Sequence, residues 1–187
     1  MHTNDGPRTL VIGLALLTAA FLWFPLPLEA GRAQEYTRFR ELQFGFSFEV
    51  PSNWNITLTP KKDYMVEGPK GSDAFEISVV IQIVQKSQNP GSSASAQLES
   101  ARKLLMAAPE AVIKPQGTIT VAAREVPCFV AVYKASTSQG SAAVFSHLQV
   151  VIDQGDYYYW VSYSGPGPVY DKYRPVAQHL LNSFQFK

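Results

Sequence analysis

The sequence is short of the residues from which most metal and redox sites are built. Among its 187 residues there are one cysteine and three histidines. One cysteine cannot form an intramolecular disulfide, and this set offers none of the spacings of tetrahedral zinc sites. A glycine-rich phosphate-binding loop is also missing, because Pro166 removes a backbone donor from the Gly165–Gly167 turn. We therefore expect no metal site and no cofactor.

Charge of either sign is not in excess. Lys and Arg number 16, Asp and Glu number 15, and the formal net charge is +1. Nucleic-acid binding draws on a surplus of basic residues that this chain lacks, so no nucleic acid is expected as a partner. Hydrophobic residues make up 46% and charged residues 17%, the balance of a folded globular domain.

Candidate catalytic groups are few. His147 and His179 remain once His2 is assigned to the N-terminal segment. No nucleophile-elbow motif accompanies them, and the sequence pairs neither histidine with a particular acid. Strand parity places His147 on a solvated sheet face, and His179 lies off the apolar stripe of the last helix, so both are expected at the surface. The chain is predicted to have no catalytic residue and not to be an enzyme, with an unrecognised hydrolase as the remote alternative.

Two further groups have ordinary interpretations. Cys128 lies within the apolar run 126–132 and is expected to be a small buried side chain rather than a nucleophile. Asp153 and Asp156 flank Gly155, a pattern typical of a hairpin turn rather than of a calcium site. Neither group is assigned a role in binding.

The first 33 residues have the three parts of a secretory signal peptide. Arg8 precedes an uncharged run, residues 9–28, and small residues ending at Ala33 provide a cleavage site. The alternative is an uncleaved membrane anchor, because about twenty apolar residues can span a bilayer. Pro25 and Pro27 disfavour that alternative, since proline breaks a helix. The sequence therefore predicts an extracytoplasmic protein, periplasmic or secreted, or one anchored to the membrane by residues 9–28.

After a short lead at residues 34–42, one domain is expected from residue 43 to residue 187. Alternation of apolar and polar residues, as between Phe44 and Val50, predicts strands with one buried face. Strands are expected at residues 44–50, 54–58, 75–84, 118–122, 128–135, 142–152 and 157–164, with a short edge strand after Asp63. The first two are expected to form a hairpin.

Two segments have the helical spacing of apolar residues. The first follows the turn-rich stretch 87–95 and runs to Pro109, with Ser93 or Ser95 as its N-cap. The second begins after the turn at residues 165–168 and carries an apolar stripe of Tyr170, Tyr173, Ala177, Leu180, Leu181 and Phe184. Strands, a helix, more strands and a terminal helix, joined by short connections, predict an α+β fold in which helices pack on the faces of an antiparallel sheet.

The two ends of this domain resemble a known family. The phrase GFSFEVPSNW, from Gly45 to Trp54, and the phrase LLNSF, from Leu180 to Phe184, are similar to the first strand and the terminal helix of the PsbP/DcrB family. The resemblance implies the PsbP/Mog-type fold, an antiparallel sheet between helices. Members include subunits that assist the oxygen-evolving photosystem, a Ran-binding protein and extracytoplasmic bacterial proteins, and most act by binding.

This chain departs from the photosynthetic branch of that family in two respects. Photosynthetic bacterial members are typically lipid-anchored, whereas residues 1–33 contain no cysteine that could carry a lipid. No metal-binding histidine of that branch can be placed on this sequence. The resemblance therefore implies a fold, and no site residue transfers with it.

The most unusual feature is a concentration of aromatic residues in the last expected strand. By parity Tyr157, Tyr159 and Tyr163 share one face, and Tyr158 and Trp160 share the other. If the first set packs under the last helix, Tyr158 and Trp160 stand on the less buried face, where rigid aromatic side chains make good binding anchors. The alternative is that the other helix covers them.

These features predict an exported, non-catalytic accessory or protein-binding domain that docks to another protein or to a membrane complex. The alternative is a small-ligand-binding module with its pocket between sheet and helices. Contact with the membrane itself is expected only through an uncleaved N-terminal segment. A contiguous exposed aromatic patch favours the first prediction, and a concave pocket with converging polar groups favours the second.

Overall fold

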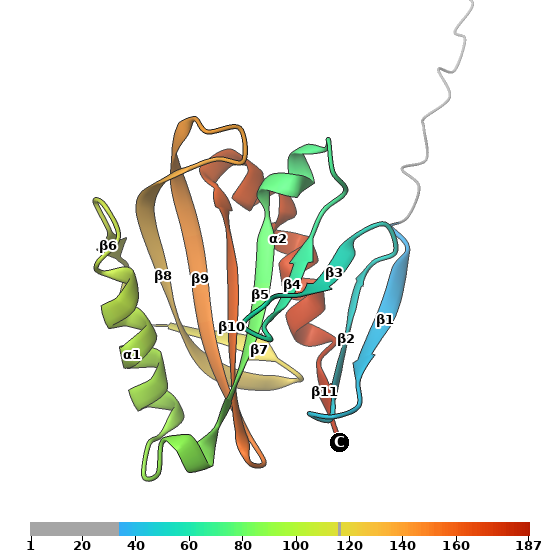
Figure 1. Ribbon diagram of the computed structural model, residues 1–187, viewed down its shortest axis with the longest axis vertical. Helices are drawn as coiled ribbons and strands as arrows, with labels where there is room; N and C mark the ends of the chain where they lie inside the picture. The colour runs from blue at the N-terminus through green and yellow to red at the C-terminus, as the bar shows by residue number, and fades with distance from the viewer. Residues whose placement is uncertain (1–33, 116) are drawn as a thin grey trace, which may run out of the picture. The chain divides into compact units, whose positions relative to one another are not determined.

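Strands dominate the computed structural model, which describes residues 34–115 and 117–187 (Figure 1). The predicted signal segment, residues 1–33, lies outside the described residues. In chain order the elements are β1 (Tyr36–Glu41), β2 (Phe46–Pro51), β3 (Asn55–Leu58), β4 (Tyr64–Glu67), η1 (Asp73–Glu76), β5 (Ser78–Gln85), η2 (Lys86–Gln88), α1 (Ala94–Leu105), β6 (Val112–Ile113), β7 (Gly117–Val121), β8 (Arg124–Ser136), β9 (Ala142–Gln154), β10 (Tyr157–Pro166), α2 (Gly167–Asn182) and β11 (Gln185–Phe186). None of the described helices is long and apolar enough to cross a membrane.

The larger sheet has eight strands and is built around a meander of β8, β9 and β10. Its order is β3-β4-β5-β10-β9-β8-β6, and β7 also pairs with β8. All the described pairings are antiparallel. Short connections bring consecutive strands side by side, as between β9 and β10, where Gln154 pairs with Tyr157. The predicted α+β fold with an antiparallel sheet is confirmed.

The predicted hairpin between residues 44–50 and 54–58 is wrong. β2 belongs to a second sheet of three strands, in the order β1-β2-β11, whereas β3 pairs with β4 in the larger sheet. Both edges of β2 are already occupied, because β1 pairs along its whole length and β11 pairs with Phe46 and Ser47. The turn after Pro51 therefore carries the chain from one sheet to the other.

The lead expected at residues 34–42 belongs to the folded unit, because it contains β1. This strand pairs in register with β2, from Tyr36 opposite Pro51 to Glu41 opposite Phe46. Phe39 packs on the main core and forms an aromatic pair with Phe48, with ring centroids 5.2 Å apart. The alternation is hard to recognise in the sequence, since the inward face of β1 carries one large apolar side chain between two polar ones.

Two apolar cores lie on opposite faces of the larger sheet. The main core packs β2 and α2 against the sheet, and the smaller one packs α1 against the other face (Figure 1). The helix stripe predicted for the C-terminal segment is confirmed for Tyr170, Ala177, Leu180 and Leu181, which are buried. Burying a large apolar side chain such as Phe48 stabilises the fold by about 1.5–3 kcal/mol.

The helix on the other face begins as the sequence indicates. Ser93 is its N-cap, and its Oγ accepts a hydrogen bond of 3.2 Å from the amide of Ala96. Leu98 and Ala101 then turn toward the sheet, where Val151 and Tyr158 meet them. Both faces of the central strands are consequently covered.

Candidate functional site

Tyr158, one of the two predicted binding residues, lies beneath α1. Its side chain is 3% exposed, and its hydroxyl donates a hydrogen bond of 2.5 Å to the carbonyl oxygen of Ser92. The structure therefore follows the alternative in which a helix covers this residue, because the loop before α1 carries that helix back over the sheet. A partner could reach Tyr158 only if α1 moved.

Trp160 lies on the same face and is half-buried against the α1 core. Its indole Nε1 is buried and has no hydrogen-bond partner among the described residues. On the opposite face of β10, Tyr159 and Tyr163 pack in the main core, as the parity of the strand predicts. A binding role for Tyr158 and Trp160 stays a prediction.

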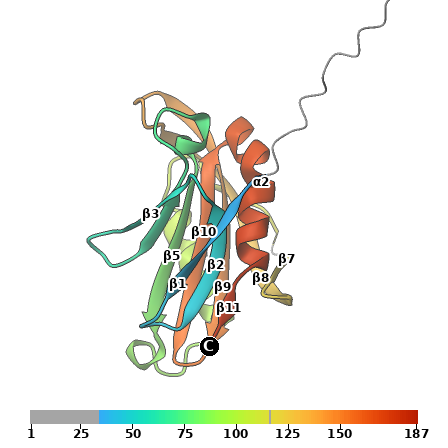
Figure 2. The ribbon, with the colours of Figure 1, turned by 90° about the vertical axis from the view of Figure 1, so that its right-hand side faces the viewer.

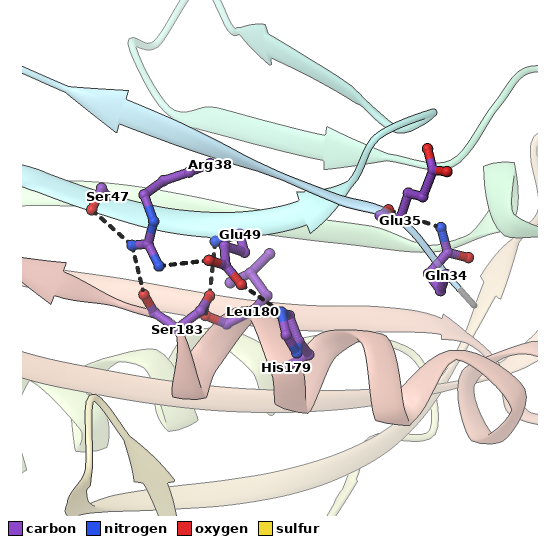
Figure 3. A network of polar contacts seen from close by, with 8 residues as sticks. All are labelled: Gln34, Glu35, Arg38, Ser47, Glu49, His179, Leu180 and Ser183. Carbon is purple, nitrogen blue, oxygen red and sulfur yellow. Dashed lines mark hydrogen bonds and ion pairs between the residues drawn. The ribbon is translucent and has the colours of Figure 1, made fainter.

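The expectation that neither histidine has an acidic partner is wrong for His179. Its Nε2 lies 2.9 Å from Oε2 of Glu49, a residue 130 positions earlier on β2 (Figure 3). Glu49 also accepts a hydrogen bond of 2.7 Å from Nη2 of Arg38 on β1. The hydrogen bond to His179 and then that from Arg38 hold the pKa of the Glu49 carboxyl below its usual value. No spacing in the sequence signals this pair, because it depends on α2 packing beside β2.

Ser183 stands next to this pair but does not form a catalytic relay with it. Its Oγ accepts a hydrogen bond of 2.8 Å from the amide of Glu49 and donates one of 2.9 Å to the carbonyl oxygen of Leu180. Figure 3 shows the hydroxyl engaged by the backbone, while His179 turns to the carboxylate. The His179 ring also stacks on Tyr36, with centroids 3.8 Å apart. The network therefore joins β1, β2 and α2, but no serine hydroxyl in it forms a hydrogen bond with the His179 imidazole.

The outward face of the three-stranded sheet carries this network. In Figure 2, β1 and β2 lie at the front of the view with α2 beside them, and His179 of α2 covers Tyr36 and Glu49 on this face. A groove of about 260 Å³ runs across this face and is lined by Arg38, Arg40, Glu41, Leu42, Phe46, Ser47, Gln185, Phe186 and Lys187. Leu42, at its rim, is 75% exposed. Among the described residues no carboxylate lies within 4.0 Å of the Arg40 guanidinium, so this cation is free to meet an acidic group.

His147 is half-buried and not solvated, which corrects the expectation for it. Its ring lies between those of Phe129 and Tyr133, at centroid distances of 6.4 and 6.3 Å. Gln149 is near its Nε2, at 3.2 Å. Burial lowers the pKa of this imidazole. The larger side chains of β8 on the same face exclude water, which parity within β9 alone does not reveal.

A cavity of about 380 Å³ lies between α2, β7 and the sheet. It is lined by Lys114, Thr118, Ile119, Cys128, Val130, Ser146, Leu148, Tyr163, Tyr170, Asp171, Arg174, Ala177, Gln178 and Leu181. Cys128 is 7% exposed, as expected for a small buried side chain, and burial raises the pKa of its thiol. A pocket between sheet and helices is the feature that the ligand-binding alternative expects, but its lining residues could not be predicted, because the walls come from five separate segments.

The acids of the hairpin between β9 and β10 behave as turn residues. Asp153 forms an ion pair of 2.5 Å with Lys86, and the backbone carbonyl of Asp156 accepts a hydrogen bond from the Lys86 amide. Within residues 34–115 and 117–187, no group of three or more His, Cys, Asp and Glu side chains is arranged to hold a metal ion. Asp153 and the Asp156 carbonyl instead hold Lys86 of η2 against the hairpin.

Comparison with known proteins gives matches in structure alone. No family model matches the sequence, and no curated protein matches it. LpqN of Mycobacterium tuberculosis, involved in cell envelope biogenesis, is 11% identical at a TM-score of 0.55, over 82% of this chain and 91% of that one. The cyanobacterial PsbP of Synechocystis is 10% identical at a TM-score of 0.54, over 84% and 96%.

Two further structures extend the likeness. The Ran-binding protein Mog1p of Saccharomyces cerevisiae is 9% identical at a TM-score of 0.55, over 82% of this chain and 96% of that one. A structure from Bacteroides thetaiotaomicron is 12% identical at a TM-score of 0.53, and this chain spans about half of it, 49%. At such identities the likeness concerns the fold: the chain has the PsbP/Mog-type fold that its two ends resemble.

Proposed function

We propose that this protein is an exported, non-catalytic accessory domain that binds another protein through the outward face of β1, β2 and β11. The observation that carries the proposal is that this face is grooved around Arg40, an arginine without an acidic partner among the described residues. The inward face of the same strands belongs to the main core, so the surface is held on a rigid support. The fold is compatible with such a role, because one structure that shares it is a Ran-binding protein.

The charges on this face favour an acidic partner. Glu49 is engaged by Arg38 and His179, and Glu41 accepts hydrogen bonds from the Tyr64 hydroxyl and the Gln43 amide. Both carboxylates are therefore occupied within the domain, whereas the Arg40 guanidinium is not. A guanidinium binds a carboxylate through two parallel hydrogen bonds, which gives direction as well as attraction.

The outer edge of β1 suggests how the partner is held. β1 is the end strand of its sheet, and no described strand pairs with its outer edge. An extended segment can add to such an edge through backbone hydrogen bonds, with its side chains reaching the same face of the sheet. The partner we propose is therefore an extended acidic segment of another protein, lying beside Arg38 and Arg40.

Site-specific crosslinking in cells tests this proposal. A photoreactive amino acid placed at Arg40 is expected to capture a protein that the same group at Lys103, on α1 across the sheet, does not capture. Arg40→Glu should remove binding of the captured protein, and Lys103→Glu should retain it. Equal capture at both positions, or binding that survives Arg40→Glu, would contradict the proposal.

Export is tested separately by sequencing the N-terminus of the protein in the extracytoplasmic fraction. A start at Gln34 supports cleavage after Ala33. A retained Met1 in the membrane fraction would support the anchor instead, and a cytoplasmic location would contradict export altogether. The absence of catalysis is the part of the proposal that rests on chemistry: the Ser183 hydroxyl is bonded to backbone groups and not to His179.

A further inference from the structure

The cavity beneath α2 is independent of the face proposed to bind a protein. Its inner walls are buried and mostly apolar: Cys128, Leu148, Tyr163, Tyr170, Ala177 and Leu181. Its volume of about 380 Å³ falls at the lower end of the range of ligand pockets, about 300–1,000 Å³. An apolar body of modest size can therefore be enclosed here.

Two polar side chains around the cavity are bonded within the domain. The Tyr163 hydroxyl donates a hydrogen bond of 2.5 Å to the carbonyl oxygen of Tyr170. Gln178 Nε2 donates one of 3.3 Å to the carbonyl oxygen of Thr120, which ties α2 to β7 across the mouth. These bonds hold α2 against the strands that form the other walls of the cavity.

The rim is different, because its charges are not balanced. Lys114 and Arg174 are exposed there beside a single acid, Asp171. In the part of the chain that the structure describes, neither cation has a carboxylate within 4.0 Å. Burial raises the pKa of the Tyr163 and Tyr170 phenols, and of the two nearby rim charges Asp171 adds to that rise while Arg174 opposes it. Positive charge thus stands at the entrance to an apolar chamber.

We propose that this cavity binds a small amphipathic carboxylate. The apolar body would pack against Leu148, Ala177 and Leu181, and the carboxylate would lie at the rim between Lys114 and Arg174. A neutral molecule of the same shape gains the apolar contacts but not the charge interactions.

Octanoate and 1-octanol are matched probes for this site. Titration of the purified protein, followed by NMR of the alanine and leucine methyl groups, is expected to show saturable shifts at Ala177, Leu148 and Leu181 with octanoate. Octanol should bind at the same methyls about ten- to twentyfold more weakly, because it lacks both partly exposed charge contacts. Because the readout is local, binding to the apolar N-terminal segment does not interfere.

Variants separate the charge from the cavity. Arg174→Gln and Lys114→Gln should each weaken octanoate about three- to fivefold and leave octanol unchanged, whereas Lys103→Gln on the other face of the sheet should alter neither. Arg40→Glu should not change the binding of octanoate, so a negative result for this cavity leaves the proposed protein-binding face untouched, and the reverse also holds. Absence of saturable shifts at these methyls, equal binding of the two probes, or equal loss of both on Arg174→Gln would overturn the proposal.

Discussion

Oε2 of Glu49 and Nε2 of His179, from residues 130 positions apart, lie 2.9 Å from each other. The contact fastens the last turns of α2 to the middle strand of the small sheet. Arg38 binds the other carboxylate oxygen, so one side chain links three elements. Removing that carboxylate is therefore the most direct way to loosen the small sheet.

We expect Glu49→Gln to lower the free energy of unfolding at pH 7 by about 0.5–1 kcal/mol, because the contacts are partly exposed. The pKa of this carboxyl is lowered in the folded state, so its contribution is present above the usual value of 4.5 and is lost as the pH falls through the folded value. The difference in the free energy of unfolding between variant and parent should accordingly be smaller in acid than at pH 7. Urea titrations at pH 7 and in acid measure this difference.

Glu110→Gln is the matched control for that experiment. Glu110 pairs with Lys134 at 2.7 Å, but both side chains are more exposed than those of the Glu49 network. Its loss should cost less than that of Glu49. A Glu49 variant as stable as the parent at pH 7 would show that the network contributes nothing.

His147 should make the fold sensitive to mild acid. Its pKa is lowered by burial, so the unfolded chain, with a histidine pKa near 6.5, binds the proton more readily than the folded one. Stability should therefore be full above about pH 6.5 and fall as the pH drops toward the folded pKa. His147→Gln should flatten this part of the stability curve, measured by thermal unfolding from pH 7.5 to pH 5. An unchanged slope in the variant would refute the assignment to His147.

The hydroxyl of Tyr158 is expected to be structural. Tyr158→Phe removes its hydrogen bond to the Ser92 carbonyl and should lower the free energy of unfolding by about 1 kcal/mol. Trp160→Phe loses an indole nitrogen that has no partner among the described residues, so no hydrogen-bond cost is added to the change in packing. Partner capture through position 40 should survive Tyr158→Phe. If a folded Tyr158→Phe variant no longer captured the partner, that result would support Tyr158 as a binding residue.

Gly68 allows a close backbone contact between the end of β4 and η1. A Cβ at this position would lie 2.5 Å from the backbone carbon of Ala74, which cannot move as a side chain could. We expect Gly68→Ala to cost about 1–3 kcal/mol, the usual penalty of overpacking. Gly117→Ala, where a Cβ meets nothing within 4 Å, should change the stability by about 0.5 kcal/mol or less. Similar effects of the two changes, measured by chemical unfolding, would contradict this account.

Local pattern was enough to predict most of the elements. Apolar alternation located β5, β8, β9 and β10 to within a few residues, and Ser93, one of the two serines expected as the N-cap, marks the start of α1. Pairing was harder. The turn at Pro51–Asn53 is typical of a hairpin, yet β2 pairs with β1 and β11 instead. The short strands β6 and β11 went unrecognised, because two residues carry no periodicity.

By itself, then, the sequence determined the α+β class, the order of the principal strands, the division of the β10 side chains between two faces and the buried state of Cys128, because each depends on the periodicity or apolar character of nearby residues. The tertiary structure alone decided which strand accompanies β2, that α1 covers Tyr158, that His179 meets Glu49, and that five segments enclose a cavity beneath α2. These features join residues far apart in the chain. Their geometry follows from how the layers pack, which no local pattern encodes.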